Sequence, residues 1–245
     1  MFESSNPALN ENTFSRLERS AAANKMTIGG SAIKTLILLT LVCLSGSFSW
    51  QYMLQNPEKA YGMLMGGVIT GLVLAMVIIF KQTLAPMLSP LYALAQGFVL
   101  GGLSASMEVM YPGIVVQAIT LTLATLLAML SLYGMRIIQA TAKFRAALLA
   151  ATGGIFLVYI ASFILGFFGV SVPFIHSATP IGIGFSLIVV GIAALNLVLD
   201  FDLIERGARA GAPKYMEWYG AFALMVTLIW LYIEILRLLS KLRSR

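Results

Sequence analysis

Seven apolar segments, each about twenty residues long, constrain the fold of this chain more than any other feature. A helix of about twenty residues spans the ~30 Å hydrocarbon core of a bilayer. Inside a bilayer every backbone N–H and C=O needs an internal partner, so runs of this length predict transmembrane helices. The predicted spans are residues 34–54, 61–80, 88–109, 113–133, 145–168, 181–200 and 218–239.

The composition excludes an ordinary soluble domain. Of the 245 residues, 59% are hydrophobic and only 11% are charged, whereas soluble domains carry about 25% charged residues. The net charge of +6 does not indicate a nucleic-acid partner, because the cations lie in short clusters between the apolar runs, as topology signals do. We therefore expect an all-α integral membrane protein of seven transmembrane helices, with the lipid bilayer as its main partner.

The chain divides into two predicted regions. Residues 1–33 are polar and lack the apolar core of a cleavable signal peptide, so they predict a flexible cytoplasmic tail before a membrane domain of residues 34–245. Cys43 lies in the first apolar run and has no second cysteine to pair with. Without a Cys/His cluster we expect no structural metal site and no cofactor.

The positions of Lys and Arg predict the orientation. The N-terminal segment and the second, fourth and sixth loops hold eleven cations, whereas the alternate loops before the last span hold only Lys59. Because positive residues collect on the cytoplasmic side, the N-terminus and the even-numbered loops are predicted to be cytoplasmic. The eleven cations are Arg16, Arg19, Lys25, Lys34, Lys81, Arg136, Lys143, Arg145, Arg206, Arg209 and Lys214.

The last span conflicts with this rule. Seven crossings place the C-terminus outside, yet Arg237, Lys241, Arg243 and Arg245 all lie there. Either the final helix crosses against the rule, held by the other six, or it re-enters and returns to the cytoplasmic side. We favour a full crossing by a helix that is buried in protein.

One face of the third span carries small and polar residues. Gly97, Gly101, Ser104 and Glu108 recur at helical spacing and so share a stripe. The Gly97/Gly101 pair matches a G-x-x-x-G pattern, which predicts close packing against a neighbouring helix. Glu108 ends the stripe, either as a carboxylate at the water interface or as a functional acid.

Two aspartates close the sixth span. An ionisable group inside a span costs roughly 2.5–3.5 kcal/mol at the helix centre, so it is a candidate functional residue. Asn196 precedes Asp200 by four residues and shares its face, whereas Asp202 lies about 200° further round the helix. We therefore expect Asp200 to point into the bundle, and Asp202 to pair with loop cations such as Arg206.

Polar residues also recur in the last span. Thr227, Glu234 and Lys241 are spaced seven residues apart, with Arg237 beside them. Glu234 is either satisfied by Arg237 at i+3 or is a carboxylate of the bundle interior.

Several activities lack the residues they need. A retinal protein needs a lysine midway along the last helix, and Lys241 lies beyond the apolar part. An intramembrane serine protease needs a histidine in a span, but His176, the only histidine, lies in a loop. Zinc-protease, P-loop and dinucleotide-binding patterns are absent from the sequence. We therefore expect no enzyme activity.

Six segments spread along nearly the whole chain have the pattern of one known family. They are SSNPAL (4–9), MTIGGSAIKT (26–35), GFVLGGLSASMEVMYPGIVVQA (97–118), LDFDLIERG (199–207), EWYGAF (217–222) and WLYIEILRLLSKL (230–242). Together they resemble the Bax inhibitor-1 (transmembrane Bax-inhibitor-motif) family, and in particular its bacterial branch.

This resemblance implies six helices around a central final helix, in a bacterial inner (plasma) membrane. It also implies a pH-sensitive calcium leak or cation/proton exchange. In the family, an aspartate at the end of the sixth helix and one in the last helix share a proton and latch the pore. Asp200 matches the first aspartate through its D-x-x-L-I context, Glu108 matches a family acid in the third helix, and Asp202 falls where the family varies.

The second aspartate is where the chain departs from the family. Thr227 or an apolar neighbour occupies its expected position, and Glu234, seven residues later, is the only acid of the predicted last span. Either Glu234 replaces the partner of Asp200 or the pair is lost. Two carboxylates in contact would share a proton. Calcium, which takes several oxygen ligands, would bind Asp200 and Glu234, assisted by Glu108 and Asn196.

Two other functions stay open. A non-conducting membrane protein could modulate a membrane-protein partner such as a membrane protease, for which a flexible polar tail is suited. A small-solute secondary transporter would be favoured by inverted repeats with broken helices, which the sequence does not clearly contain.

Overall fold

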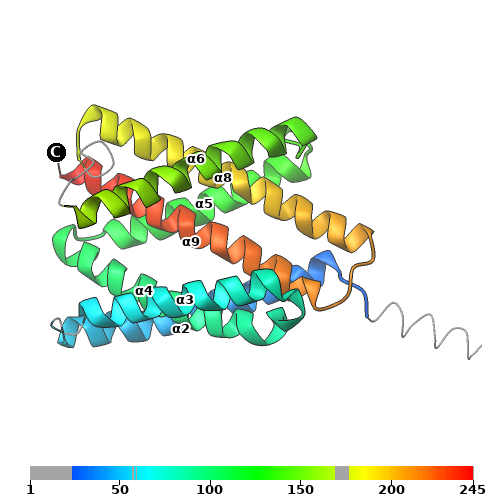
Figure 1. Cartoon of the computed structure of the whole chain (residues 1–245), viewed down its shortest axis with the longest axis horizontal. Coiled ribbons are helices and arrows are strands. Elements are labelled where there is room, and N and C mark those ends of the chain that lie inside the picture. Colours follow the sequence, from blue (N-terminus) through cyan, green and yellow to red (C-terminus); the bar gives the residue numbers. More distant parts are fainter. Residues whose placement is uncertain (1–23, 57, 59, 169–176, 245) are drawn as a thin grey trace, which may run out of the picture.

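The computed structural model describes residues 24–56, 58, 60–168 and 177–244 (Figure 1). Most of the predicted tail, together with His176, lies outside these residues. The described part of the chain is helical and contains no β-strand, which confirms the predicted all-α class. Its helices are α2 (Ile28–Gln55), α3 (Ala60–Phe80), the 3-10 helix η2 (Gln82–Leu84), α4 (Ala85–Met110), α5 (Ile114–Gly134), α6 (Ala142–Phe167), α8 (Pro180–Arg209) and α9 (Met216–Arg243).

Helices α2 and α8 extend furthest beyond a single end of their predicted spans. Helix α2 starts at Ile28, six residues early, because the Thr27 hydroxyl caps it by accepting a hydrogen bond of 2.9 Å from the backbone N–H of Gly30. Helix α8 runs nine residues past position 200 and ends at Arg209. Two i,i+4 ion pairs, Asp202–Arg206 and Glu205–Arg209, support this extension. Asp200 and Asp202 therefore lie within the length of α8 and not at its end.

Helix α9 forms the centre of the bundle. It crosses the middle of Figure 1, between α2, α3 and α4 on one side and α5, α6 and α8 on the other. It packs against α2, α4, α5 and α8. Helices α3 and α6 form an outer layer, with α3 on α4 and α6 on α8. The predicted central position of the last helix is correct, but α9 is directly enclosed mainly by four of the other six helices.

Close packing of α2 on α4 depends on glycines. A Cβ at Gly101 would overlap the backbone of Gly46 on α2, and a Cβ at Gly97 would overlap the Ser45 side chain and the Val42 backbone. Ser49 of α2 donates a hydrogen bond of 2.6 Å to the Phe98 carbonyl in the same contact. The G-x-x-x-G pattern therefore marks a helix–helix contact, as predicted.

Backbone contacts identify two ends of the bundle. At one, called here the N-terminal end, Met26 N–H donates to the Ala212 carbonyl at 2.7 Å, and Lys214 N–H donates to the Asn24 carbonyl at 2.9 Å. At the opposite, C-terminal end, the Arg243 guanidinium donates to the Pro112 carbonyl at 2.6 Å. Helix α9 thus runs uninterrupted from one end to the other, about 42 Å for its 28 residues. Its length and continuity suit the full crossing that we favoured over a re-entrant helix.

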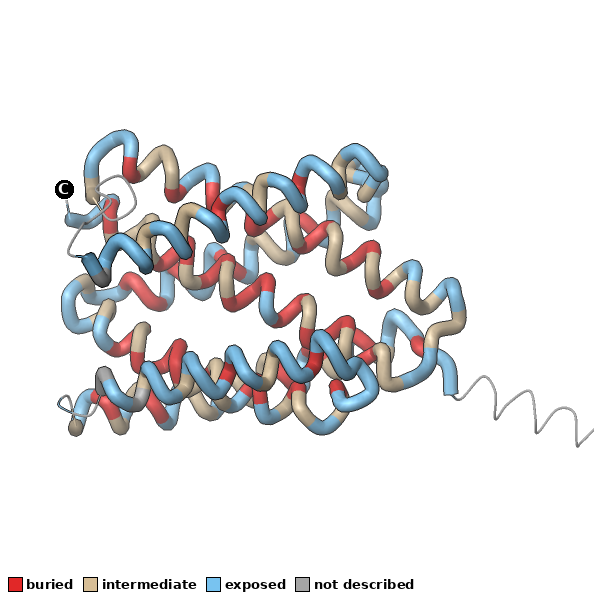
Figure 2. The backbone as a smooth tube through the Cα atoms, viewed as in Figure 1, coloured by how far each residue is buried: buried red, intermediate tan, exposed pale blue. Residues whose placement is uncertain are grey.

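Burial follows the same arrangement (Figure 2). Over half of the apolar core of α9 is buried in protein, whereas the core of α6 is 11% buried. Large apolar side chains on the outer helices are exposed, such as Leu72 of α3 and Phe156 of α6. Within the described residues, six helices are long and apolar enough to span a membrane, and in α3 the apolar part is the shorter Leu64–Phe80. An apolar outer surface around a buried central helix is the arrangement expected when lipid is the solvent.

Candidate functional site

The Asp200 carboxylate lies at the contact between α8 and α9. The Thr227 hydroxyl of α9 is close enough to interact with it. Oδ2 of Asp200 is buried, and no described residue gives it a hydrogen bond. Thr227 directs its own hydroxyl to the Ala223 carbonyl at a long 3.4 Å. Asp200 is therefore an acid of a candidate membrane span without a described cationic partner. Burying such a group costs free energy, which makes Asp200 a candidate functional residue.

The Asp202 carboxylate forms ion pairs with two arginines. Its Oδ2 lies 2.8 Å from Arg206 Nη2 and 3.0 Å from Arg145 Nη2 of α6. The predicted pair with Arg206 is confirmed. The contact with Arg145, 57 positions earlier in the chain, was not predicted; it leaves Asp202 only 9% exposed. Because two guanidinium groups neutralise it, Asp202 anchors α6 to α8.

Glu234 belongs to a buried ion-pair network in the C-terminal half of α9. It is 1% exposed, and its Oε1 accepts hydrogen bonds of 3.0 Å from both Tyr159 of α6 and Arg237. Arg237 also donates to the Tyr159 hydroxyl at 2.8 Å and lies over its ring. Both interpretations of Glu234 hold, since it pairs with Arg237 and is also interior. Seven residues separate it from Thr227, or about 10 Å along the helix, so it does not replace the aspartate missing beside Asp200.

Glu108 and Asn196 make local contacts. Glu108 accepts hydrogen bonds from the backbone N–H groups of Gly113, at 2.5 Å, and Val115, at 3.1 Å, and so caps the start of α5. Asn196 donates to the Thr152 hydroxyl of α6 at 2.9 Å. The four predicted gate residues therefore lie in separate contacts. Across the described ranges, no group of three or more His, Cys, Asp or Glu side chains could hold a metal ion.

Glu217 and Lys241 are buried charges that the sequence reasoning missed as site residues. Glu217, 1% exposed, forms an ion pair with Lys34 and accepts two hydrogen bonds of 2.9 Å from Thr27. Lys241, 4% exposed, donates to the Ser186 hydroxyl at 2.8 Å and to the Gly182 carbonyl at 3.0 Å. Both could have been suspected as charges at the edges of a span, but their partners lie far away in sequence.

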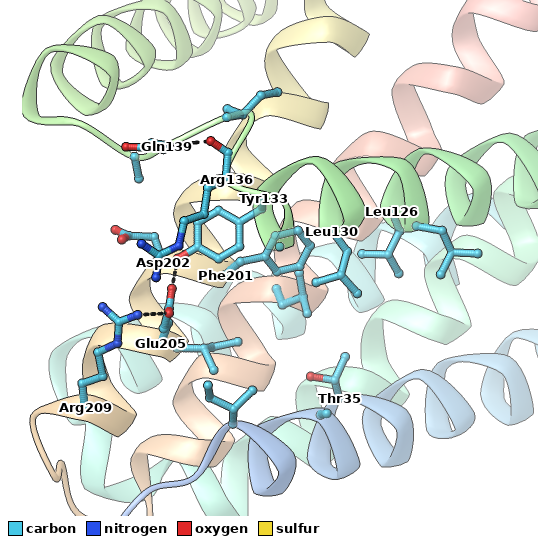
Figure 3. Close-up of a pocket in the computed structure, with 18 of the residues that line it drawn as sticks. Thr35, Leu126, Leu130, Tyr133, Arg136, Gln139, Phe201, Asp202, Glu205 and Arg209 are labelled. Atoms are coloured by element: carbon cyan, nitrogen blue, oxygen red, sulfur yellow. Dashed lines mark hydrogen bonds and ion pairs between the residues drawn. The ribbon is translucent and has the colours of Figure 1, made fainter.

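A cavity of about 750 Å³ opens at the N-terminal end, between α2, α5 and α8 (Figure 3). Its deeper wall is apolar and includes Leu126, Leu130 and Phe201. Its mouth is polar, where Tyr133 donates to Glu205 and Glu205 pairs with Arg209. Phe201 directly follows Asp200, so the cavity reaches the helix that carries this acid.

The chain matches the Bax inhibitor 1 like family over residues 6–244, which is nearly its whole length. Neither the curated proteins nor the solved structures gave a match. The matched region contains the seven α-helices of the described residues, the Asp200–Thr227 contact and the buried networks of Glu217 and Glu234. The chain is therefore a membrane protein that belongs to the Bax inhibitor 1 like family.

Proposed function

We propose that this chain is a calcium-permeable leak pathway of the Bax-inhibitor type, with Asp200 as the carboxylate that controls it. The observation that carries the proposal is the buried Asp200 Oδ2, which lacks a hydrogen-bond donor among the described residues at the contact between α8 and the central helix α9. An acid in this position can hold either a proton or a cation, and each state places a different charge between the two helices.

Thr227 gives the proposed gate a different chemistry from an aspartate pair. A protonated Asp200 can donate a hydrogen bond to the Thr227 hydroxyl, which keeps α8 and α9 together. An ionised Asp200 next to a hydroxyl has no second charge to repel it, so a cation or water must solvate it instead. The gate would therefore respond to a proton held by Asp200 alone, and not to a proton shared between two carboxylates.

The remaining acids serve other roles in this proposal. Arg237 and Tyr159 bind the Glu234 carboxylate through an ion pair and a hydrogen bond. Two arginines form ion pairs with Asp202. Lys241 adds a buried cation near the C-terminal end of α9. These charges disfavour a calcium site beside Glu234, so we assign calcium, as the transported ion, to the neighbourhood of Asp200. The activity is transport without catalysis, in a bacterial inner membrane with the N-terminus cytoplasmic.

Calcium efflux from vesicles containing the purified protein tests this function. We expect wild type to leak calcium, and Asp200→Asn to leak about ten-fold less, as expected when ~1.4 kcal/mol of carboxylate–cation interaction is lost. Asp202→Asn is the matched control, because it removes an acid two residues away whose charge is already neutralised. Absence of flux from folded wild type would overturn the channel and favour a non-conducting interaction role. Flux that Asp200→Asn leaves unchanged would remove this residue from the gate.

A further inference from the structure

The groove at the N-terminal end opens sideways between two helices. Helices α2 and α5 both pack on α8 and α9 but hardly touch each other. The cavity of about 750 Å³ fills the space between them and ends on Leu224 of α9. Its size is that of a small-molecule pocket, and it opens to the outer surface of the helix bundle.

The walls of the groove are suited to an acyl chain. Leu36 on α2 and Leu127 on α5 form its edges and are 64% and 62% exposed. Phe201 and Leu224 form its buried floor. Exposed leucines on both edges contact lipid tails in a bilayer, so the groove is continuous with the lipid phase.

The mouth of the groove is lined by charged side chains of both signs. Glu205 pairs with Arg209, and Asp202 pairs with two further arginines, so both acids are neutralised. Arg136 forms no ion pair with any described carboxylate, although it lines the same mouth (Figure 3). Arg136 and Arg209 line the groove beside these two acids. Arg145 and Arg206 bind Asp202 from outside the lining, so the four arginines around the mouth outnumber its two acids.

The backbone at Arg136 supports a role for its side chain. It has a φ of 58°, in the left-handed region, and follows Met135, the C-cap of α5. Glycine or asparagine usually occupies this position after a helix, because a Cβ is strained there. The arginine here adopts a backbone conformation that most residues avoid, and it lies where the groove meets the helix ends.

We propose that this groove binds one anionic phospholipid. An acyl chain lies between α2 and α5, and the phosphate lies at Arg136 and Arg209. On the orientation that the loop cations predict, this end faces the cytoplasmic leaflet, where basic residues at helix ends attract anionic headgroups. The lipid would touch Phe201, next to Asp200, and Leu224, one turn before Thr227. The site depends on the groove and its charges, and not on the calcium leak.

Native mass spectrometry of the protein, released from micelles with equal amounts of phosphatidylglycerol and phosphatidylcholine of identical chains, tests the site. We expect wild type to retain phosphatidylglycerol selectively, and Arg136→Gln to retain about five-fold less. Lys81→Gln, an exposed cation at the same end but outside the groove, is the matched control and should retain as much as wild type. Leu130→Trp should reduce retention of both lipids by filling the groove.

Three results would overturn the proposal. They are equal retention of the two lipids by wild type, retention that Arg136→Gln leaves unchanged, and displacement of the lipid by soluble glycerol phosphate. Arg136 is exposed, so Arg136→Gln is expected to fold, and its result decides the matter even if Leu130→Trp does not fold. Because the readout is bound lipid, failure of the calcium-leak proposal would not affect it.

Discussion

Glu217 at the start of α9 forms an ion pair with Lys34 of α2, a residue 183 positions earlier in the chain. The same carboxylate accepts both the backbone N–H and the hydroxyl of Thr27, the residue that caps α2. Lys34 also lies over the Trp218 ring, 5.7 Å from its centroid. One buried acid thus joins α2 to the central helix α9.

Replacement of Glu217 should therefore loosen the N-terminal end. We expect Glu217→Gln to lower the free energy of unfolding by about 2 to 3 kcal/mol. This is at or just below the cost of about 3–5 kcal/mol for breaking a fully buried ion pair, because Lys34 retains some solvent access. Thermal unfolding in detergent micelles measures the change. Glu58→Gln, at an exposed position, should change stability by less than about 0.5 kcal/mol, and an equal loss in both variants would contradict this role for Glu217.

The glycine contact between α2 and α4 gives a steric prediction. A Cβ at position 101 has no room against the Gly46 backbone, so Gly101→Ala should destabilise the bundle by about 1–3 kcal/mol, as overpacking does. Gly153→Ala is the control, because nothing lies within 4 Å of a Cβ there. Thermal unfolding in detergent micelles measures this change as well. If Gly101→Ala were as stable as Gly153→Ala, the two helices would not pack as described.

Much of the fold could be predicted from sequence because bilayer thickness sets the length of a span. Every predicted span overlaps one helix, and the Gly97/Gly101 pair lies where a helix approaches closely. Helix ends were harder to predict. The apolar run that predicts this span ends at Asp200, but α8 continues to Arg209. The ion pairs that stabilise this last part are between charged residues, which a hydropathy window does not favour.

The polar contacts were only partly predictable, because helical periodicity reaches only the next turn. It predicted the pairs of Asp202 with Arg206 and of Glu234 with Arg237, which are four and three residues apart. It could not reveal that Arg145 neutralises Asp202 or that Lys241 binds Ser186, since those contacts depend on how separate helices pack. The Asp200–Thr227 contact was approached only through the family pattern, as the place where a second acid was missing.

The Glu234 network should matter for stability and not for the leak. We expect Glu234→Gln to lower the free energy of unfolding by about 2 kcal/mol, because Arg237 loses its charged partner inside the bundle. Calcium efflux should stay within about two-fold of wild type, since less than ~0.5 kcal/mol of the transport barrier depends on this residue.

A double-mutant cycle provides the control for Glu234. Arg237→Gln should cost less in the Glu234→Gln background than alone, because the two residues share one interaction. A leak that Glu234→Gln abolishes while the protein stays folded would instead place Glu234 in the ion path.

The most direct test of the Asp200–Thr227 gate is calcium efflux from vesicles between about pH 6 and about pH 8, with Thr227→Asp compared with Thr227→Asn and wild type. Thr227→Asp would place two carboxylates in contact, and such a pair shares a proton at low pH and separates when that proton is lost. We expect Thr227→Asp to leak less at low pH and more at high pH than wild type, with the steepest pH response of the three. Thr227→Asn, which adds no charge, should retain the wild-type response. Identical pH responses in all three folded proteins would contradict the account, because Thr227 would then not be the residue that faces the gating carboxylate.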